Sequence, residues 1–556
     1  MSAGVVWWQR GAIYQIYPRS FQDSGGDGVG DLRGIEARLD YLVRLGIDAI
    51  WISPIFSSPM ADFGYDVANY CDIDPRFGTL TDFDRLLAAA HARGVKVILD
   101  FVPNHSSSQH PWFLESRRSR TSPKRSWYIW RDPAPGGGPP NNWISDFGGS
   151  AWEWDESTGQ YYLHAFLKEQ PDLDWRNPDV AQAMYDVLRF WFARGVDGFR
   201  IDVLWHLVKA EGLPDNPPNP AYRMESGEMH RVLQVHSTDQ PEVHAIAAAM
   251  RRIADGFGER VLIGEIYLPL ERLMHYYGPG NTGVHLPFNF QLVDAPWNAA
   301  SLRTMIAAYE AALPRGGWPN WVLGNHDRPR IAARIGEAQA RVAAMLLLTL
   351  RGTPTLYYGD ELGMADVAIP TAQVQDPREL REPGLGLGRD PVRTPMAWDT
   401  TANAGFTTGA PWLPLHADWP ARNVATEAGA PGSMLALYKE LLALRRAHPA
   451  LSVGEITLVD VSNWPDAPDA PNVLAYERRH EGERLLVALN LGHAAAELVV
   501  PDWAHGADPL LSTIAAPGST TGAVHAPVSG RLVLAPDEGV VLRVVPVPGP
   551  VAGSHS

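Results

Sequence analysis

A helix that ends at a glycine and runs into a short apolar strand recurs along this chain and constrains its fold most. The stretch 81–93, with Thr81 as expected N-cap, has apolar residues on one face and is followed by Gly94 and the apolar segment 95–102. Helices and strands that alternate in this way are typical of a parallel sheet. Strands are predicted at 13–17, 47–52, 95–102, 195–202, 256–265, 286–288, 321–323 and 355–358. Eight is the number of strands that a (β/α)8 TIM barrel needs.

Two regions depart from this pattern. Residues 104–175, which are rich in Pro, Gly, Trp and Tyr, are too long for a βα loop and predict a subdomain inserted after the third strand. Beyond a helix at about 433–447, alternating segments separated by turn residues predict a C-terminal antiparallel β domain. We therefore expect a barrel at 1–103 and 176–455, an inserted subdomain at 104–175 and a C-terminal β-sandwich at 456–547.

Composition excludes several classes of function. The net charge of −16 argues against a nucleic acid partner, because phosphate binding needs a basic surface. A single cysteine, Cys71, excludes an intramolecular disulfide framework and a Cys-rich metal site. The longest apolar stretch, 342–350, is too short to span a bilayer, and residues 1–10 do not resemble a targeting segment. We expect a cytoplasmic protein without a membrane partner and leave its oligomeric state open.

Polar side chains stand at the ends of four predicted strands. The carboxyl ends of barrel strands meet at one face, which is the active face of such folds. A lone aspartate would more often cap a helix or form a salt bridge, but four such strand ends together predict an active site. The groups, in chain order, are Asp100 with Asn104 and His105, Arg200 with Asp202, Glu265, and His326 with Asp327.

The motifs around these residues resemble those of the α-amylase superfamily, glycoside hydrolase family 13. Within it the chain is most similar to the branch of α-glucosidases and oligo-1,6-glucosidases. The resemblance runs from Tyr14 to beyond Trp398. Its motifs are Asp100-Phe-Val-Pro-Asn-His105, Gly198-Phe-Arg-Ile-Asp202, Gly264-Glu265, Gly324-Asn-His-Asp327, Gly64-Tyr-Asp-Val67, Gln170-Pro-Asp-Leu-Asp-Trp175 and Gly388-Arg-Asp-Pro-Val-Arg-Thr-Pro-Met396.

The resemblance implies a retaining mechanism that needs no cofactor. Cleavage of an acetal requires an acid for the leaving oxygen and an anion for the oxocarbenium-like carbon, held by two carboxyls about 5 Å apart. Asp202 is implied to be the nucleophile, Glu265 the acid and later the base, and Asp327 a third acid that binds sugar hydroxyls. We expect Arg200 to keep Asp202 ionised, and a less charged surrounding to keep Glu265 protonated.

The same resemblance implies a subsite for one terminal sugar. His105 and His326 would donate hydrogen bonds to its hydroxyls, although as histidines they could also be metal ligands. Tyr65 would stack on the ring. Phe166 would add an aromatic wall or belong to the core.

A clamp is expected at the far end of this subsite. Asp66 and Arg389 would grip the hydroxyls at the non-reducing end, with Arg393 as the alternative to Arg389. A cavity closed in this way admits only a terminal glucose, so exo action on small oligosaccharides is predicted.

The loop 23–31 resembles a calcium loop of this branch. Its candidate ligands are Asp23, Asp27, Val29 and Asp31. Gly25 stands where the family commonly has an asparagine ligand, so a turn held by hydrogen bonds is the competing interpretation. A bound Ca²⁺ would be structural and remote from the chemistry.

The linkage that is cleaved is harder to predict. Val203, directly after the nucleophile, resembles α-1,6-specific members, whereas 204–209 and 213–220 resemble bacterial enzymes that act on α-1,4 substrates. We expect an α-1,4-specific α-glucosidase with transglucosylation as a side activity. The alternatives are an oligo-1,6-glucosidase, a sucrose or trehalose isomerase and, more remotely, a non-catalytic relative.

Overall fold

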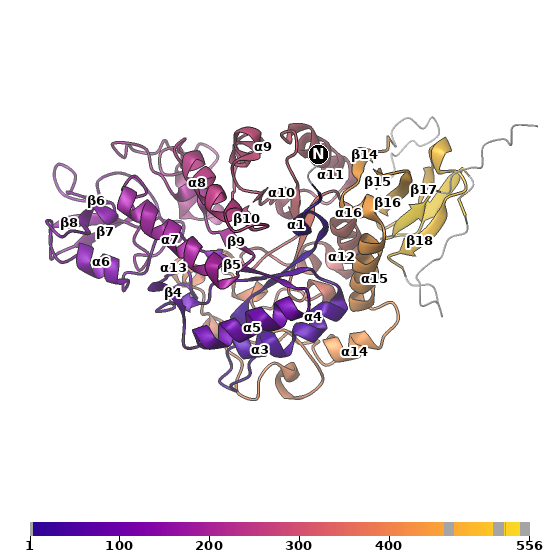
Figure 1. The fold of residues 1–556 in the computed structure, drawn as a ribbon, viewed down its shortest axis with the longest axis horizontal. Coiled ribbons are helices and arrows are strands. Elements are labelled where there is room, and N and C mark those ends of the chain that lie inside the picture. The colour runs from indigo at the N-terminus through magenta and orange to yellow at the C-terminus, as the bar shows by residue number, and fades with distance from the viewer. Residues whose placement is uncertain (1–3, 461–471, 515–526, 529, 545–556) are drawn as a thin grey trace, which may run out of the picture.

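A closed parallel barrel forms the centre of the molecule (Figure 1). The computed structural model describes residues 4–460, 472–514, 527–528 and 530–544. Eight strands pair in parallel in the order β11-β10-β9-β5-β2-β1-β13-β12, and a parallel bridge from Asn289 to Trp321 joins the two ends. The predicted TIM barrel is thus confirmed. Its strands are β1 (Ile13–Ile16), β2 (Ala49–Ile52), β5 (Lys96–Phe101), β9 (Gly198–Ile201), β10 (Val261–Gly264), β11 (Leu286–Pro287), β12 (Asn320–Val322) and β13 (Thr353–Tyr357).

Helices surround the barrel and connect its strands. The longer ones are α4 (Leu39–Leu45), α5 (Leu80–Ala92), α7 (Pro178–Arg194), α8 (Val243–Asp255), α11 (Ala299–Ala312), α12 (Ile331–Thr349) and α15 (Met434–Ala447), and the six-residue α3 (Leu32–Ala37) precedes α4. Shorter helices are α1 (Trp7–Arg10), α2 (Pro18–Phe21), α6 (Pro111–Ser116), α9 (Leu270–Met274), α10 (Gln291–Asp294), α13 (Pro377–Arg381), α14 (Val424–Ala428) and α16 (Pro449–Ser452). Helix α7 ends at Gly195, whose φ of 110° is left-handed, and this sharp end turns the chain into β9.

The N-terminus of α5 differs from the prediction. Thr79, not Thr81, caps the helix: its hydroxyl accepts from the Asp82 N–H, and the Asp82 carboxylate accepts from the Thr79 N–H at 3.0 Å. The sequence offers the same Thr-x-x-Asp spacing twice, two residues apart. The earlier copy closes the capping box, so the helix begins at Leu80.

The segment between β5 and α7 forms a small sheet of its own at one end of the molecule (Figure 1). Its antiparallel order is β6-β8-β7, and Trp143, Trp152 and Leu163 pack in its core. The strands are β6 (Trp130–Arg131), β7 (Trp152–Asp155) and β8 (Gln160–Leu163). A hairpin of β3 (Phe56–Ser57) and β4 (Asn69–Ile73) occupies the loop after β2.

Antiparallel sheets form the opposite end of the molecule, as expected (Figure 1). One has the order β14-β15-β16-β20-β18, the other pairs β17 with β19, and apolar residues of both share one core. The strands are β14 (Glu455–Leu458), β15 (Val473–His480), β16 (Glu483–Asn490), β17 (Ala496–Val499), β18 (Asp508–Ser512), β19 (Arg531–Leu534) and β20 (Gly539–Arg543). The predicted end at residue 547 lies outside the described residues, and the domain boundaries stay predictions.

Among the residues that the structure describes, no helix combines the length and apolar character that crossing a membrane requires. The cytoplasmic location stays a prediction.

Candidate active site

One buried guanidinium gathers three carboxyl groups at the carboxyl ends of adjacent strands. Arg200 lies in β9, which pairs with β5 on one side and with β10 on the other. Asp100 belongs to β5, and Glu265 directly follows β10. Its Nη1 lies 2.8 Å from Asp100 Oδ1 and 2.7 Å from Asp202 Oδ1, and its Nη2 lies 2.7 Å from Glu265 Oε2. The strand order therefore brings together residues that are far apart in the chain, and Arg200 orients all three carboxyls.

Val203 adds a strained backbone to this cluster. Its φ of 36° and ψ of 47° are left-handed, a conformation that a β-branched residue adopts at a cost of about 1–3 kcal/mol. In this conformation its N–H donates to Glu265 Oε2 at 2.9 Å. The strained turn after β9 thus helps to hold the side chain that follows β10.

Burial governs the protonation of the two carboxyls. It raises the pKa of Asp202 well above its ordinary value, and although Arg200 lowers that pKa, it does not cancel the effect. Burial likewise raises the pKa of Glu265, against the opposing charge of Arg200. Arg200 thus lowers the pKa of Asp202 as expected, but burial, which the sequence does not reveal, has the larger effect. Two neighbouring carboxyls of raised pKa titrate as one unit, and the singly protonated pair supplies one acid and one anion.

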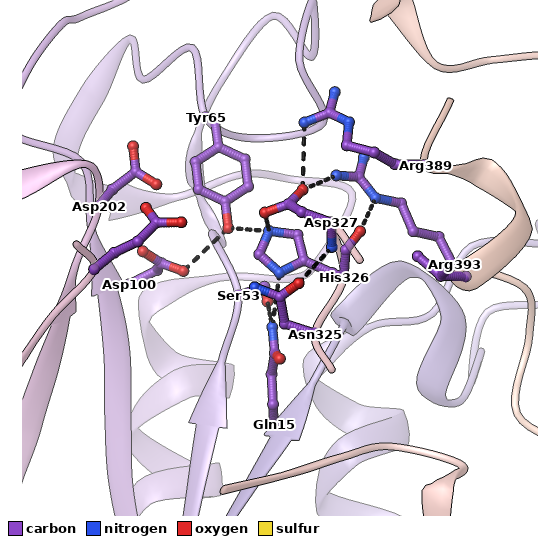
Figure 2. A network of polar contacts seen from close by, with 12 residues as sticks. Gln15, Ser53, Tyr65, Asp100, Asp202, Asn325, His326, Asp327, Arg389 and Arg393 are labelled. Atoms are coloured by element: carbon purple, nitrogen blue, oxygen red, sulfur yellow. Dashed lines mark hydrogen bonds and ion pairs between the residues drawn. The ribbon is translucent and has the colours of Figure 1, made fainter. Parts of the chain in front are cut away.

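Asp327, five residues beyond β12, carries a charge that its neighbours stabilise (Figure 2). Arg393 Nη2 lies 2.7 Å and Arg389 Nη1 3.5 Å from its Oδ1, and His326 Nε2 lies 3.2 Å from its Oδ2. Burial would raise the pKa of Asp327, but its contact with His326 and the charges of Arg393 and Arg389 hold that pKa well below the ordinary value. Its carboxylate is thus suited to accept hydrogen bonds rather than to give a proton.

A buried chain of hydrogen bonds positions Tyr65 and His326 (Figure 2). Gln15 Nε2 donates to His326 Nδ1 at 2.9 Å, so the ring proton is on Nε2, which lies 2.6 Å from the Tyr65 hydroxyl. That hydroxyl donates to Asp100 Oδ2 at 3.2 Å. Burial lowers the pKa of His326, so the ring is neutral. Since both nitrogens contact protein groups, a contact of His326 with sugar stays a prediction.

A cavity of about 320 Å3 opens over these groups, at the small end of the range for small-molecule sites. Eight of the predicted site residues line it, whereas Arg200 and His326 lie behind the wall. The eight are Tyr65, His105, Phe166, Asp202, Val203, Glu265, Asp327 and Arg389.

Asp66 does not lie at this cavity, which corrects the predicted clamp. Its carboxylate accepts from the Ser58 hydroxyl at 2.9 Å and from the N–H groups of Ala61 and Asp62 at 2.9 and 3.0 Å, so it stabilises a turn. Asp62, which the sequence interpretation missed, lines the cavity instead, and its Oδ1 lies 2.7 Å from Arg389 Nη2. Two acids in one loop look alike in sequence, and only the path of the turn separates their roles.

Arg389, rather than Arg393, faces the cavity. Besides Asp62 it contacts Asp376, whose Oδ1 lies 2.7 Å from Arg389 Nη2, whereas Arg393 is fully buried and donates to the His326 carbonyl at 2.8 Å. Gln170, within a quoted motif but without a predicted role, lines the same wall and lies 3.2 Å from His105 Nε2. Asp376 and Gln170 are therefore further members of the site.

The two aspartates of this loop give contrasting predictions. Asp62→Asn should lower kcat/KM about 100-fold with a smaller loss of stability than Asp66→Asn, because Arg389 loses a partner at the cavity but keeps Asp376. Asp66→Asn should cost about 1–3 kcal/mol of stability, because the NH2 group of the new asparagine would face the N–H groups of Ala61 and Asp62 without an acceptor. It should leave kcat/KM within about three-fold. Glucose-release kinetics and thermal unfolding measure both variants. A loss of activity in Asp66→Asn together with wild-type activity in Asp62→Asn would show that Asp66, as first predicted, binds the substrate.

The loop 23–31 is held by hydrogen bonds. Asp23 accepts from the N–H groups of Gly25, Gly26 and Gly28 at 2.7–2.8 Å and from the Thr407 hydroxyl. The Asp31 carboxylate accepts from the N–H and hydroxyl of Ser24 and from the Gly34 N–H, and Asp27 accepts from the Val29 N–H. Within the described residues, no three His, Cys, Asp or Glu side chains form a metal site. The carboxylates of the loop thus have hydrogen-bond donors within the protein, and the calcium prediction remains untested.

Removal of divalent ions should therefore leave the thermal stability unchanged. Dialysis against a chelator is expected to shift the melting temperature by less than about 1 °C, because internal donors satisfy the loop carboxylates. Asp23→Ala should cost about 1–3 kcal/mol in either buffer, since it strands several N–H groups. A rise in melting temperature on addition of Ca²⁺ to the dialysed protein would support a metal site instead.

Comparison with known protein families agrees with this geometry. Residues 15–454 match the family described as "Alpha amylase, catalytic domain", and residues 466–509 match "Maltogenic Amylase, C-terminal domain". The curated relatives include an oligo-1,6-glucosidase of Parageobacillus thermoglucosidasius, 38% identical, which covers 89% of this chain and 92% of its own. A probable α-glucosidase of Rhizobium meliloti (strain 1021) is 42% identical over 89% of this chain and 91% of its own.

Solved structures of similar enzymes cover almost the whole chain. That of an α-glucosyl transfer enzyme, XgtA, has a TM-score of 0.90 at 40% identity and covers 98% of this chain and 100% of its own. That of the trehalulose synthase MutB from Pseudomonas mesoacidophila MX-45 has a TM-score of 0.87 at 37% identity, with coverages of 98% and 100%.

Proposed function

Because this chain belongs to the α-amylase family of glycoside hydrolases, we propose that it is an exo-acting retaining α-glucosidase of short α-linked oligosaccharides. Asp202 would attack the anomeric carbon while Glu265 protonates the leaving oxygen. Water, activated by the Glu265 carboxylate, would then release α-glucose. Any other hydroxyl that replaces this water gives transglucosylation.

The contact between Asp62 and Arg389 is the observation that carries exo action. We infer that this ion pair of two lining residues would close one end of the cavity, with Asp376 and Asp327 holding Arg389 in place. A chain that continued beyond the terminal sugar would have to displace this buried pair, at a cost of several kcal/mol. A terminal sugar can instead place its hydroxyls against charged, fixed partners.

For the linkage we propose α-1,4 before α-1,6. The relatives include both oligo-1,6-glucosidases and α-glucosidases, so they do not decide between them. The α-1,4 preference rests on the segments 204–209 and 213–220, whereas Val203, at the cavity wall, is the feature that favours α-1,6. The similarity to a trehalulose synthase keeps sucrose isomerisation as the second candidate.

One substrate series tests the proposal. Free glucose should be released from maltose faster than from isomaltose, and maltotriose blocked at its non-reducing end should not react, because the blocking group would have to displace the pair of Asp62 and Arg389. Product analysis by chromatography on maltose, isomaltose, sucrose and blocked maltotriose measures this. Cleavage of the blocked substrate would contradict exo action, and conversion of sucrose to an isomer with little free glucose would favour the isomerase.

A further inference from the structure

A second cavity, of about 580 Å3, adjoins the active-site cavity at the same end of the barrel. Its walls come from the segments that follow β10, β11 and β12 and from the beginning of α11. Tyr267 and Arg328 line both cavities, so the two share a wall. The proposed chemistry uses none of the residues on its other walls.

The shared wall is a fixed stack of planar groups. The ring of Tyr267 lies parallel to that of Phe290, with centroids 4.0 Å apart and planes 13° apart. The Arg328 guanidinium lies 4.9 Å from the Tyr267 ring, and its Nη1 is 3.8 Å from Asp294 Oδ1. Such a stack gives a preformed surface, so a ligand that lies along it binds without the free-energy cost of ordering these side chains.

Tyr267 of the shared wall and the proposed acid belong to the same short segment after β10. Glu265 is the proposed acid for the leaving oxygen and stands two residues before Tyr267, and both side chains line the active-site cavity. A leaving group bonded to that oxygen therefore lies on the side of Glu265. Its remaining atoms can follow the Tyr267 ring into the second cavity.

The lining of the second cavity selects for apolar atoms. Away from the shared wall most of its residues are apolar, among them Ile266, Leu268, Pro269, Leu273, Ala295 and Met305, and its neutral polar residues are Gln291 and Ser301. A sugar site needs several directed polar partners, as the active-site cavity has. Here the polar residues are fewer: Asp294 is exposed and faces Arg328, and Gln291 and Ser301 are the neutral ones. An alkyl or aryl group fits these walls better than a second sugar does.

We propose that this cavity binds the apolar portion of an alcohol, either as the aglycone that leaves or as the acceptor that enters; the inference rests on the proposed function. In hydrolysis, the bond between the anomeric carbon and the aglycone oxygen breaks, that oxygen takes the Glu265 proton, and Asp202 bonds to the carbon. In transfer, the acceptor hydroxyl gives its proton to Glu265, its oxygen bonds to the carbon, and the bond to Asp202 breaks.

The test compares kcat/KM for methyl and n-octyl α-glucoside, the latter below its micelle-forming concentration. The wild type should favour the octyl substrate by about ten-fold or more, because only its chain reaches the apolar walls. Met305→Lys, which places a charge in the cavity, and Ala295→Trp, which fills it, should each reduce this preference about five-fold or more. Both should change the methyl value less than about two-fold. Leu114→Lys, at a half-exposed leucine of α6, is the matched control and should leave the preference unchanged.

Each outcome separates this inference from the proposed function. If the wild type hydrolyses both glucosides but neither cavity variant alters the preference for octyl, the cavity does not bind the aglycone. If the wild type hydrolyses neither glucoside, the proposed function fails, and titration calorimetry with the same two glucosides tests the cavity. Tighter binding of the octyl compound that Met305→Lys abolishes would then support the site, and equal binding would overturn it.

Discussion

Asp202→Asn is expected to lower kcat/KM for maltose about 10⁴-fold or more while the protein stays folded. An amide is a poor nucleophile, so the covalent step loses the group that forms the new bond. The fold should tolerate the change because Arg200 keeps Asp100 and Glu265 as partners. The substitution also replaces a carboxyl whose pKa burial raises with a neutral amide, so no buried charge is stranded. Glucose release and thermal unfolding measure the two effects.

A matched variant separates the chemistry from a general effect of substitution. Asp186→Asn, on the exposed face of α7, makes the same chemical change remote from the cavity and should retain wild-type kinetics. A second readout is the covalent intermediate: a slowly hydrolysed fluoroglucoside should add one glucosyl unit to the intact mass of the wild type but not of Asp202→Asn. Labelling of the variant, or activity within ten-fold of wild type, would assign the nucleophile elsewhere.

The barrel could be predicted from the sequence because its signals are local. Each predicted strand follows a helix or a turn and is mostly apolar, and all eight strands are present. The N-terminus of α5 was misplaced by two residues because Thr79 and Thr81 offer equivalent capping pairs. Which pair closes depends on the packing around the helix, which spacing does not reveal.

The sequence could predict those site residues whose type and position at a strand end already indicate their role. Strand ends located Asp202, Glu265 and Asp327 correctly at one cavity. Asp62 was missed because the turn between it and Asp66 decides which acid faces the cavity. The net rise in the pKa of Asp202 was missed because burial is a property of the folded site, whereas the neighbouring cation is visible in the sequence.

Arg200→Met should have the second large effect, a loss of stability that depends on pH. The substitution leaves three buried carboxyls without the cation that contacts all of them, and such a broken buried network costs about 3–5 kcal/mol. Burial already raises the pKa of Asp100 to about 6 in the presence of Arg200, and without that charge the pKa should rise further.

The sign of the pH dependence follows from proton linkage. An acid whose pKa is higher in the folded than in the unfolded protein binds more protons when folded, so stability falls as pH rises from the unfolded pKa, about 4, through the folded one. The destabilisation by Arg200→Met should therefore be at least about 1 kcal/mol larger at pH 8 than at pH 5. Chemical denaturation at both pH values measures the difference.

Arg445→Met provides the control for this prediction. Arg445 is equally buried, but its partners among the described residues are backbone carbonyls, those of Leu348, Leu350, Gly352 and Leu451. Its loss should destabilise the protein by a similar amount at pH 5 and pH 8, because no carboxyl is released from its charge. If Arg200→Met also showed equal losses at the two pH values, the three carboxyls would not be what Arg200 stabilises, and the shared proton assigned to Asp202 and Glu265 would have to be withdrawn.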